Sequence, residues 1–226
     1  MNLGRSRNKS KSAPHAGDAN AQQADVRIIG GTFRGRRLAY HGDPVVRPMK
    51  HRTREAIFNL VSTECGGRHA IDLFAGTGAL ALEALSRGAS SATFIEKHVP
   101  SSRIVEENIR TLGVADRATL MVTSAFLWVK RDLPVAATEG PSAGKPWLVF
   151  CSPPYSFYIE QQTEMLDLIR RIQHHAPAES ILIVEAEEPF DFEILRRGDA
   201  DGSKPGTWDV RAYAPAVVGL WRPTQG

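Results

Sequence analysis

Cysteines and long apolar runs are both scarce in this 226-residue chain. The only two cysteines, Cys65 and Cys151, lie far apart, so we expect neither a disulfide framework nor a cysteine zinc site. No apolar run approaches the ~20 residues of a membrane-spanning helix, and no apolar stretch follows the basic N-terminal residues as it would in a secretory signal. We therefore expect a cytoplasmic protein with no metal site and no membrane partner.

Large apolar side chains are almost absent from residues 1–24. Such a segment cannot bury enough surface to offset the entropy lost on ordering, so we predict a disordered tail. The remaining residues are enough for one domain of ordinary size. The net charge of +3 favours an anionic partner, such as a nucleic acid, only weakly.

Residues 25–64 concentrate positive charge. Glycine turns in "RIIGGTFRGRRL" predict two short strands, and apolar residues at helical spacing in "REAIFNLV" predict a helix after them. Basic side chains neutralise phosphates, so we interpret this segment as an RNA-binding element next to the active cleft rather than a solvated charged face. The candidate RNA-binding residues are Arg27, Arg34, Arg36, Arg37, Arg47, Lys50, Arg52 and Arg54.

Short apolar strands alternate with amphipathic helices from residue 65 onwards. This alternation predicts right-handed βαβ units and a doubly wound, mostly parallel sheet. The segment "TWDVRAYAPAVVGLWRP" near the C-terminus predicts two strands with no helix between them, and hence an antiparallel edge. We therefore expect one Rossmann-like α/β domain over residues 65–226.

The stretch "DLFAGTG", residues 72–78, predicts a cofactor site. Ligands of open α/β sheets bind outside the carboxyl ends of the strands, where this stretch begins. Glu96 ends the next strand and could accept both ribose hydroxyls of an adenosine-containing cofactor. The letters "GTGALA" also fit a dinucleotide fingerprint, which keeps an NAD-linked oxidoreductase as an alternative.

The carboxylate that opens "DLFAGTG" favours one cofactor over the other. A pyrophosphate would be a poor neighbour for Asp72, whereas the ammonium group of S-adenosylmethionine would be a good one. We therefore predict S-adenosylmethionine rather than NAD. The candidate cofactor-binding residues are Asp72, Phe74, Gly76, Gly78, Glu96, Ser124 and Ala125.

The motif "SPPY", residues 152–155, predicts the catalytic site. It follows an apolar strand that a doubly wound order places beside the first strand, so we expect the motif to face the cofactor crevice. Two prolines end a sheet ladder and make a rigid, extended ledge. The Ser152 side chain and the Pro153 carbonyl could accept the hydrogens of an exocyclic base amine, while Tyr155 stacks on the base. The candidate catalytic residues are Ser152, Pro153, Pro154 and Tyr155.

Four stretches together resemble the RsmD family of bacterial small-subunit rRNA guanine-N2 methyltransferases. They are "RIIGGTFRGRRL", "RPMKHRTREAIFNL", "IDLFAGTGALALEALSRGA" and "CSPPY", and the resemblance covers most of residues 26–190. It implies a class I S-adenosylmethionine-dependent methyltransferase with a seven-stranded sheet. It also implies a monomer that makes N2-methylguanosine in the 16S rRNA of the small ribosomal subunit.

Three positions depart from the family pattern. The family usually has Asp where Ser152 stands, a Thr-Thr-Asp-like stretch at residues 49–51, and Asp or Asn at Ser124. A serine-type motif also occurs in cytosine-N4 DNA methyltransferases. The alternatives are therefore an enzyme acting on DNA or on another RNA base, and a non-catalytic ribosome assembly factor.

Overall fold

The computed structural model describes residues 25–42, 49–188, 190–196 and 204–224. The predicted tail at 1–24 and the candidate Arg47 lie outside the described residues. Seven strands form one sheet in the order β3-β2-β1-β4-β5-β7-β6. In chain order these are β1 (His69–Asp72), β2 (Ser91–Ile95), β3 (Ala118–Met121), β4 (Trp147–Cys151), β5 (Ile181–Glu187), β6 (Gly206–Tyr213) and β7 (Ala216–Pro223).

Strands β1 to β5 pair in parallel, and β7 pairs antiparallel with both β5 and β6. The predicted doubly wound sheet with an antiparallel edge is therefore confirmed. The chain builds outward from β1 to β3 and then returns to place β4 on the other side of β1. Such a switch point is where α/β sheets bind their ligands, and here it lies between β1 and β4.

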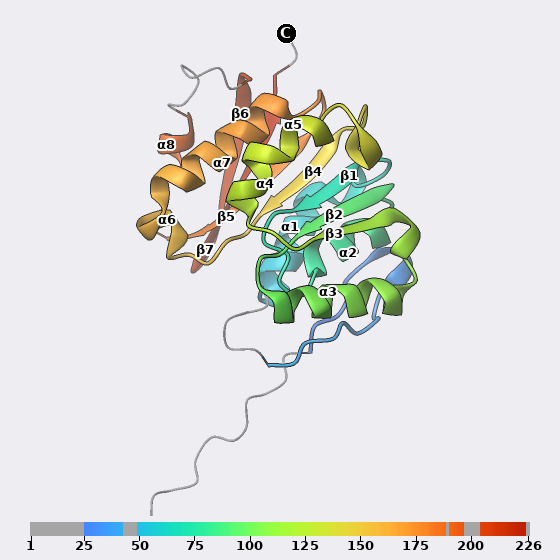
Figure 1. Ribbon diagram of the computed structural model, residues 1–226. Helices are drawn as coiled ribbons and strands as arrows, with labels where there is room; N and C mark the ends of the chain where they lie inside the picture. The colour runs from blue at the N-terminus through green and yellow to red at the C-terminus, as the bar shows by residue number, and fades with distance from the viewer. Residues whose placement is uncertain (1–24, 43–48, 189, 197–203, 225–226) are drawn as a thin grey trace, which may run out of the picture.

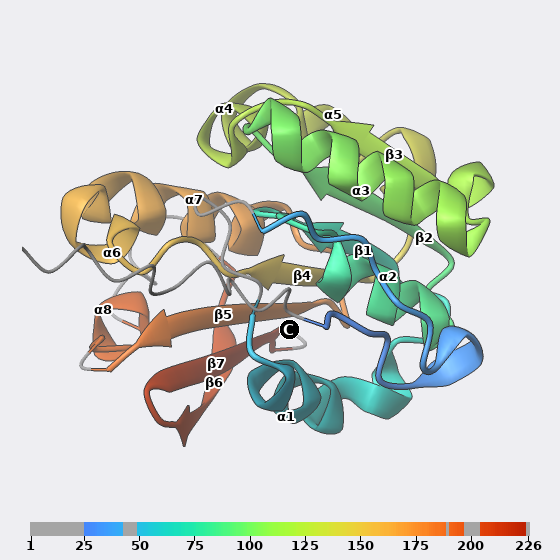
Figure 2. The same cartoon turned by 90° about the horizontal axis from the view of Figure 1, so that it is seen from below.

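Helices cover both faces of the sheet, with α4, α5 and α7 in front and α1 and α2 behind (Figure 1). Figure 2 also shows α1 on the opposite side of the sheet from α4 and α5. The helix bounds are α1 (His51–Val61), α2 (Ala79–Ser86), α3 (Val99–Leu112), α4 (Ala125–Arg131), α5 (Leu133–Ala136), α6 (Phe157–Glu160), α7 (Gln162–His175) and α8 (Glu193–Arg196). Short 3-10 turns are η1 (Gly31–Phe33), η2 (Ser62–Glu64), η3 (Ala115–Arg117) and η4 (Gly140–Ser142).

Alternating strand residues divide between two apolar cores. Ala70 and Leu148 pack with α1, α2 and α3, whereas Ile71 and Val149 pack with α4, α5 and α7. Because successive side chains of a strand point to opposite faces, an apolar run is needed to fill both layers. This requirement explains why β1 and β4 are buried along their whole length.

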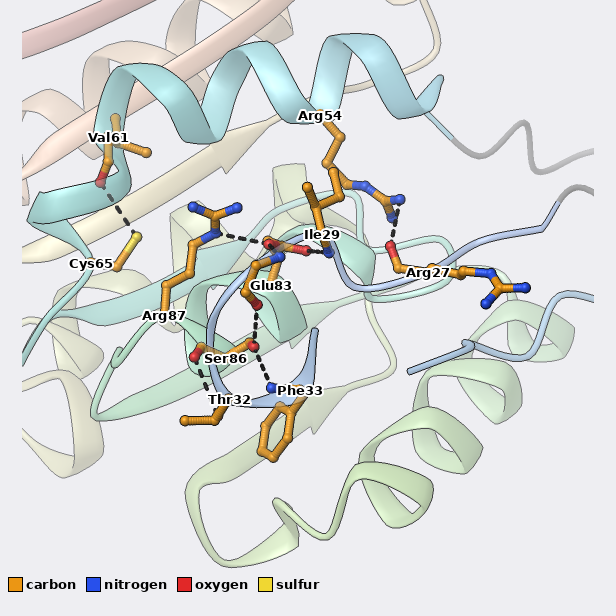
Figure 3. A network of polar contacts seen from close by, with 11 residues as sticks. Arg27, Ile29, Thr32, Phe33, Arg54, Val61, Cys65, Glu83, Ser86 and Arg87 are labelled. Atoms are coloured by element: carbon orange, nitrogen blue, oxygen red, sulfur yellow. Dashed lines mark hydrogen bonds and ion pairs between the residues drawn. The ribbon is translucent and has the colours of Figure 1, made fainter. Parts of the chain in front are cut away.

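The N-terminal segment 25–42 packs on the end of α2 through a buried carboxylate (Figure 3). Glu83 accepts the backbone N–H groups of Ile29 and Gly30 at 2.6 and 2.7 Å, and the Arg87 Nε–H at 2.8 Å. Ser86 adds two hydrogen bonds, from the Phe33 N–H to its hydroxyl and from its hydroxyl to the Gly30 carbonyl. The segment therefore shares hydrogen bonds with the α/β core of the domain.

Only part of the predicted hairpin at 26–40 forms a ladder. Its strands meet at one antiparallel bridge, between Arg27 and Arg37, with hydrogen bonds from Ile28 N–H to the Arg36 carbonyl and from Leu38 N–H to the Val26 carbonyl. The chain between them turns through η1 and contacts α2 instead of pairing further. Within the described ranges, no helix is long and apolar enough to cross a membrane.

Candidate active site

Asp72 ends β1 as a fully enclosed carboxylate, with 1% of its surface exposed. Neither of its oxygens makes a hydrogen bond of normal geometry within the described residues. Burial raises its pKa to about 7, and nearby backbone N–H groups of Ala81 and Phe74 lower it by smaller amounts. A buried carboxylate without a partner is costly, so Asp72 is suited to a cationic ligand.

The glycine turn after Asp72 brings bare backbone to the same edge of the sheet. Gly76 and Gly78 have φ values of +56° and +79°, which favour glycine. A Cβ on Gly78 would lie 3.3 Å from the Phe94 ring, so a side chain there would crowd the turn. Both glycines therefore shape the turn, and their contact with a cofactor stays a prediction.

Glu96, which directly follows β2, stabilises this turn by hydrogen bonds. One carboxylate oxygen accepts the Gly76 N–H at 2.8 Å, and the other accepts the His98 N–H at 2.7 Å. The predicted contact of Glu96 with ribose hydroxyls stays a prediction. Each oxygen retains a further lone pair for a ligand, because a carboxylate offers about four acceptor sites.

The predicted catalytic motif follows β4, and its hydroxyls converge on a residue of β5. The Ser152 hydroxyl donates a hydrogen bond to Glu185 Oε2, and the Tyr155 hydroxyl donates to Glu185 Oε1 at 2.8 Å. The Tyr158 hydroxyl donates to the Glu185 carbonyl at 2.9 Å. Burial raises the pKa of Glu185, and the hydrogen bonds from Ser152 and Tyr155 partly offset that rise.

The strand register brings the two predicted sites together. Asp72 is paired with Phe150, two residues before Ser152, so β1 and β4 end side by side. Pro153 is buried and Pro154 exposed, which leaves the ledge at the rim of the sheet. The predicted placement of "SPPY" beside the first strand is confirmed. Its position against a bound cofactor and the roles of its residues stay predictions.

Three half-buried phenylalanines stand together at this edge. Phe74 lies 6.2 Å, between ring centroids, from both Phe126 and Phe157, which lie 5.9 Å apart. Lys97 Nζ lies 5.1 Å from the centre of the Phe157 ring. The cluster joins the ends of β1, β3 and β4, so it can form an apolar wall for a ring-bearing ligand.

The candidates after β3 lie beside this cluster. Ala125 begins α4, and the Ser124 carbonyl accepts the N–H groups of Leu127 and Trp128 at 3.1 and 2.9 Å. The Ser124 side chain is half-buried and Ala125 is buried. Their backbone is therefore fixed at the carboxyl edge, where an adenine contact remains a prediction.

The described basic candidates fall at two ends of the domain. The Arg36 guanidinium donates to the Thr111 carbonyl at the end of α3, and Phe33 contacts the end of α2. In βαβ units these helix ends lie at the amino edge of the sheet. Figure 1 agrees, because the blue N-terminal turn lies on the right, whereas α6, which follows "SPPY", lies on the left. The sequence led us to expect Arg34 and Arg36 next to the active cleft. The structure places them at the opposite edge of the sheet, so this expectation is wrong for these two residues.

Lys50 and Arg52 lie at the other end. They are exposed at the start of α1, which runs about 16 Å towards the amino edge before β1 begins. Arg27 and Arg37 face each other in the N-terminal bridge, and both form ion pairs with Asp25, at 2.6 and 3.4 Å. Of the described candidates, Lys50 and Arg52 are therefore the exposed ones that we place at the edge that carries "SPPY".

Arg54 has a different role from the one predicted. It is 2% exposed, and its Nη2–H donates to the Arg27 carbonyl at 2.7 Å (Figure 3). Burial lowers its pKa, and the negative charge of Glu83 opposes that shift. The prediction that Arg54 contacts RNA is wrong, because this guanidinium holds the N-terminal segment from inside.

Neither of the buried thiols nor the buried histidine belongs to the site. Cys65 and Cys151 are buried free thiols whose burial raises their pKa values to about 11 and about 12. His69 is enclosed between the hydroxyls of Ser91 and Thr93, and burial lowers its pKa to about 4. His69 is therefore a structural residue of the sheet.

Comparison with known proteins places the whole arrangement in one family. The family model described as "Conserved hypothetical protein 95" matches residues 26–196. The chain belongs to this family. Its match includes the N-terminal segment, the glycine turn and the "SPPY" ledge, and the likeness to RsmD proteins inferred from the sequence is confirmed.

Two curated relatives carry names that describe rRNA modification. "Ribosomal RNA small subunit methyltransferase D" of Escherichia coli (strain K12) is 35% identical over 139 residues, which are 61% of this chain and 64% of that protein. "Putative rRNA methyltransferase YlbH" of Bacillus subtilis (strain 168) is 28% identical over 190 residues, which are 84% of this chain and 97% of that protein. The chain thus spans slightly less than two thirds of the E. coli relative.

A solved structure supports the same placement. "Putative methyltransferase yhhF from Escherichia coli" superposes with a TM-score of 0.66 and 27% identity, and the match covers 89% of this chain and 99% of that one. The seven-stranded sheet with its antiparallel β7 is therefore the class I methyltransferase fold.

The residues at the carboxyl edge fit S-adenosylmethionine. Asp72 offers a buried, unpartnered carboxylate for an ammonium group, and the glycine turn offers backbone that a ligand can approach closely. Glu96 offers free acceptor capacity for hydroxyls, and the phenylalanine wall offers a surface for a flat ring. Nothing in this set favours a dinucleotide pyrophosphate over a methyl donor.

Glu185, Phe126 and Phe157 are site residues that our sequence analysis did not single out. Glu185 stands in the apolar stretch "SILIVEAE", most of which forms β5. A charged residue inside such a buried run was the available signal, because buried carboxylates rarely occur without a partner or a function. The phenylalanines carried no comparable signal, since their spacing along the chain is irregular.

Proposed function

We propose that this protein transfers a methyl group from S-adenosylmethionine to the exocyclic N2 of a guanine in the 16S rRNA of the small ribosomal subunit. The proposal includes a monomeric enzyme whose segment 25–64 helps to bind RNA. The observation that carries it is the placement of "SPPY" at the end of β4, beside the unpartnered Asp72 at the end of β1. The printed name of the E. coli relative supports the choice of RNA.

The cofactor's contribution is an electrophilic methyl group on a positively charged sulfur. Asp72 and Glu96 would bind its amino-acid and ribose ends, and the glycine turn would let it lie close to the backbone. The phenylalanine wall would keep water from the reacting atoms. The position of these residues at the carboxyl edge of the sheet supports this assignment of roles.

The target base would lie against the diproline ledge. Tyr155 would stack on the base, and the Ser152 hydroxyl and the Pro153 carbonyl would accept the hydrogens of its amino group. An aromatic amine is a weak nucleophile because its lone pair is delocalised into the ring. Acceptors held rigidly by the two prolines would favour a pyramidal nitrogen and so free that lone pair.

Transfer of a labelled methyl group tests the proposal. The full chain is incubated with labelled S-adenosylmethionine and, separately, with undermethylated small subunits, naked 16S rRNA and duplex DNA. We expect label in the small subunits or their rRNA, and much less label with Asp72→Asn. Label in DNA would support a cytosine-N4 enzyme, the alternative that the serine at 152 keeps open.

A folded protein that transfers no label would contradict the proposed activity. If that protein still bound small subunits, the assembly-factor alternative would replace it. Folding of every variant is checked by circular dichroism, so that loss of label is not mistaken for unfolding.

A further inference from the structure

Glu185 is an unusual residue for the middle of a sheet. It is 6% exposed, and no ion pair to it is formed by the part of the chain that the structure describes. Burying a charge without a cation is costly, and two hydroxyl donors offset only part of that cost. The donors are the two polar side chains of "SPPY", Ser152 and Tyr155.

We propose that Glu185 supplies, through the Ser152 hydroxyl, the carboxylate that an Asp at position 152 would otherwise place at the catalytic ledge. This inference rests on the proposed function and deepens it. Glu185 is a positioning residue, because Ser152 is the group that would contact the base amine. The geometry that supports it is the short reach from β5 to the end of β4, where Cys151 pairs with Val184.

The direction of the Ser152 hydrogen bond leaves its oxygen available. Its O–H is donated to Glu185, so the lone pairs of Oγ can accept an N–H of the amine. A hydroxyl polarised by a carboxylate is a stronger acceptor than a free one, because hydrogen bonds in a chain reinforce each other. The pair thus acts as one extended acceptor with the negative charge placed behind it.

The same pair gives the surplus proton a route. Once the nitrogen has formed its new bond to carbon it is positively charged and carries one proton too many. That proton passes to Ser152 Oγ while the Ser152 proton passes to the Glu185 carboxylate. One N–H bond breaks, a serine O–H bond is replaced, and one carboxyl O–H bond forms, so no further reactant is needed. Glu185 then loses the proton to solvent.

The titratable groups around Glu185 leave it as the acceptor of that proton. Burial raises the pKa values of Tyr155 and Tyr158 above their usual range and that of Cys151 to about 12, so all three stay neutral at ordinary pH. Glu187, farther along β5, also acts on Tyr155, and the β7 residue opposite Glu185 is the uncharged Val218. A carboxyl group with a raised pKa is a better base than an ordinary one.

Glu185→Gln removes the charge while keeping the size and one acceptor oxygen. We expect turnover to fall on the order of 100-fold, as for loss of a general base, with an unchanged KM for S-adenosylmethionine. The rate is measured at saturating S-adenosylmethionine, so that protonation of Asp72, whose pKa is about 7, does not limit cofactor binding. Under these conditions the wild-type turnover should rise with pH through the Glu185 pKa, and this acidic limb should disappear in the variant. The matched control is Glu188→Gln, an exposed carboxylate three residues away.

Moving the carboxylate provides a rescue. Ser152→Asp combined with Glu185→Gln places the charge directly at the ledge, so the double variant should recover at least about tenfold over Glu185→Gln. A merely structural Glu185 would not be rescued in this way. A Glu185→Gln variant with the turnover and pH profile of Glu188→Gln, or a folded double variant no faster than Glu185→Gln, would overturn the proposal.

A readout without methyl transfer separates this inference from the proposed function. The carboxyl stretching band of Glu185 is followed by infrared titration as the difference between the wild type and Glu185→Gln. Ser152→Ala should raise the Glu185 pKa, because the lost hydrogen bond favours the ionised form. A Glu185 pKa that is the same in Ser152→Ala as in the wild type would refute the inference, even if the enzyme methylates rRNA. A wild type with no activity on any substrate would instead refute the proposed function.

Discussion

Replacing Glu83 by alanine should loosen the N-terminal segment and destabilise the whole domain. The side chain is fully buried on α2 and accepts hydrogen bonds from Ile29 N–H, Gly30 N–H and Arg87 Nε–H. Without it, two backbone N–H groups and a guanidinium lose their common acceptor. The segment that the sequence set apart as residues 25–64 is thus expected to unfold together with the sheet.

The size of the effect follows from these three contacts. Removing one partner of a buried ion pair costs about 3–5 kcal/mol, because the remaining charge stays buried. Arg87 keeps 15% of its side chain exposed and can turn partly to water, so we expect a loss near the lower end. For a chain of this length a loss of about 3 kcal/mol lowers the melting temperature by about 6–12 °C.

Urea unfolding followed by circular dichroism and tryptophan fluorescence measures this loss. The matched control is Glu106→Ala, which removes an exposed carboxylate from α3 and should change the free energy of unfolding by less than about 0.5 kcal/mol. The loss in the free energy of unfolding for Glu83→Gln should lie between those for Glu83→Ala and Glu106→Ala, since its amide oxygen can still accept a hydrogen bond. If the free energy of unfolding of Glu83→Ala were within about 1 kcal/mol of the wild-type value, the reasoning would be refuted.

Three further results are expected. Deleting residues 1–24 should leave the melting temperature nearly unchanged, because that segment has few apolar side chains to bury; a large loss of cooperativity would contradict this. Binding of S-adenosylhomocysteine, measured by calorimetry, should weaken from about pH 8 to about pH 6 as Asp72, with its pKa of about 7, becomes protonated and neutral. Asp72→Asn should bind S-adenosylhomocysteine weakly, with an affinity that does not change over this pH range. The same pH dependence in both proteins would exclude Asp72 as the group that binds the cofactor. Lys50→Ala with Arg52→Ala should flatten the salt dependence of RNA binding by about 0.7–0.9 units of slope per lost phosphate contact, whereas Arg34→Ala should not.

The fold could be predicted because its signals are local and repeated. Apolar strands such as "WLVF" alternate with helices that end at glycines, and each unit restricts its neighbours to a parallel arrangement. The same logic placed Asp72 and Ser152 at adjacent strand ends, since both follow strands near the switch point. Chain order and strand polarity were sufficient for that step.

The contacts between distant segments could not be predicted in the same way. Nothing near Arg54 in the sequence shows that it is buried under the Arg27 carbonyl. Positive charge along the chain likewise does not say which edge of the sheet an arginine reaches, so Arg34 was placed too near the cleft. Glu185 is the most informative case, because its partners lie 33 and 30 residues away and only the pairing of β4 with β5 joins them.

Nucleoside analysis of methylated small subunits tests the central claim most directly. Subunits from cells lacking this protein are incubated with the full chain and labelled S-adenosylmethionine, and the rRNA is digested to nucleosides for mass spectrometry. Our account predicts that the label is recovered as N2-methylguanosine at one site in 16S rRNA, and that Asp72→Asn gives much less of it under the same conditions. Label recovered as N4-methylcytosine, or in no nucleoside at all, would contradict it.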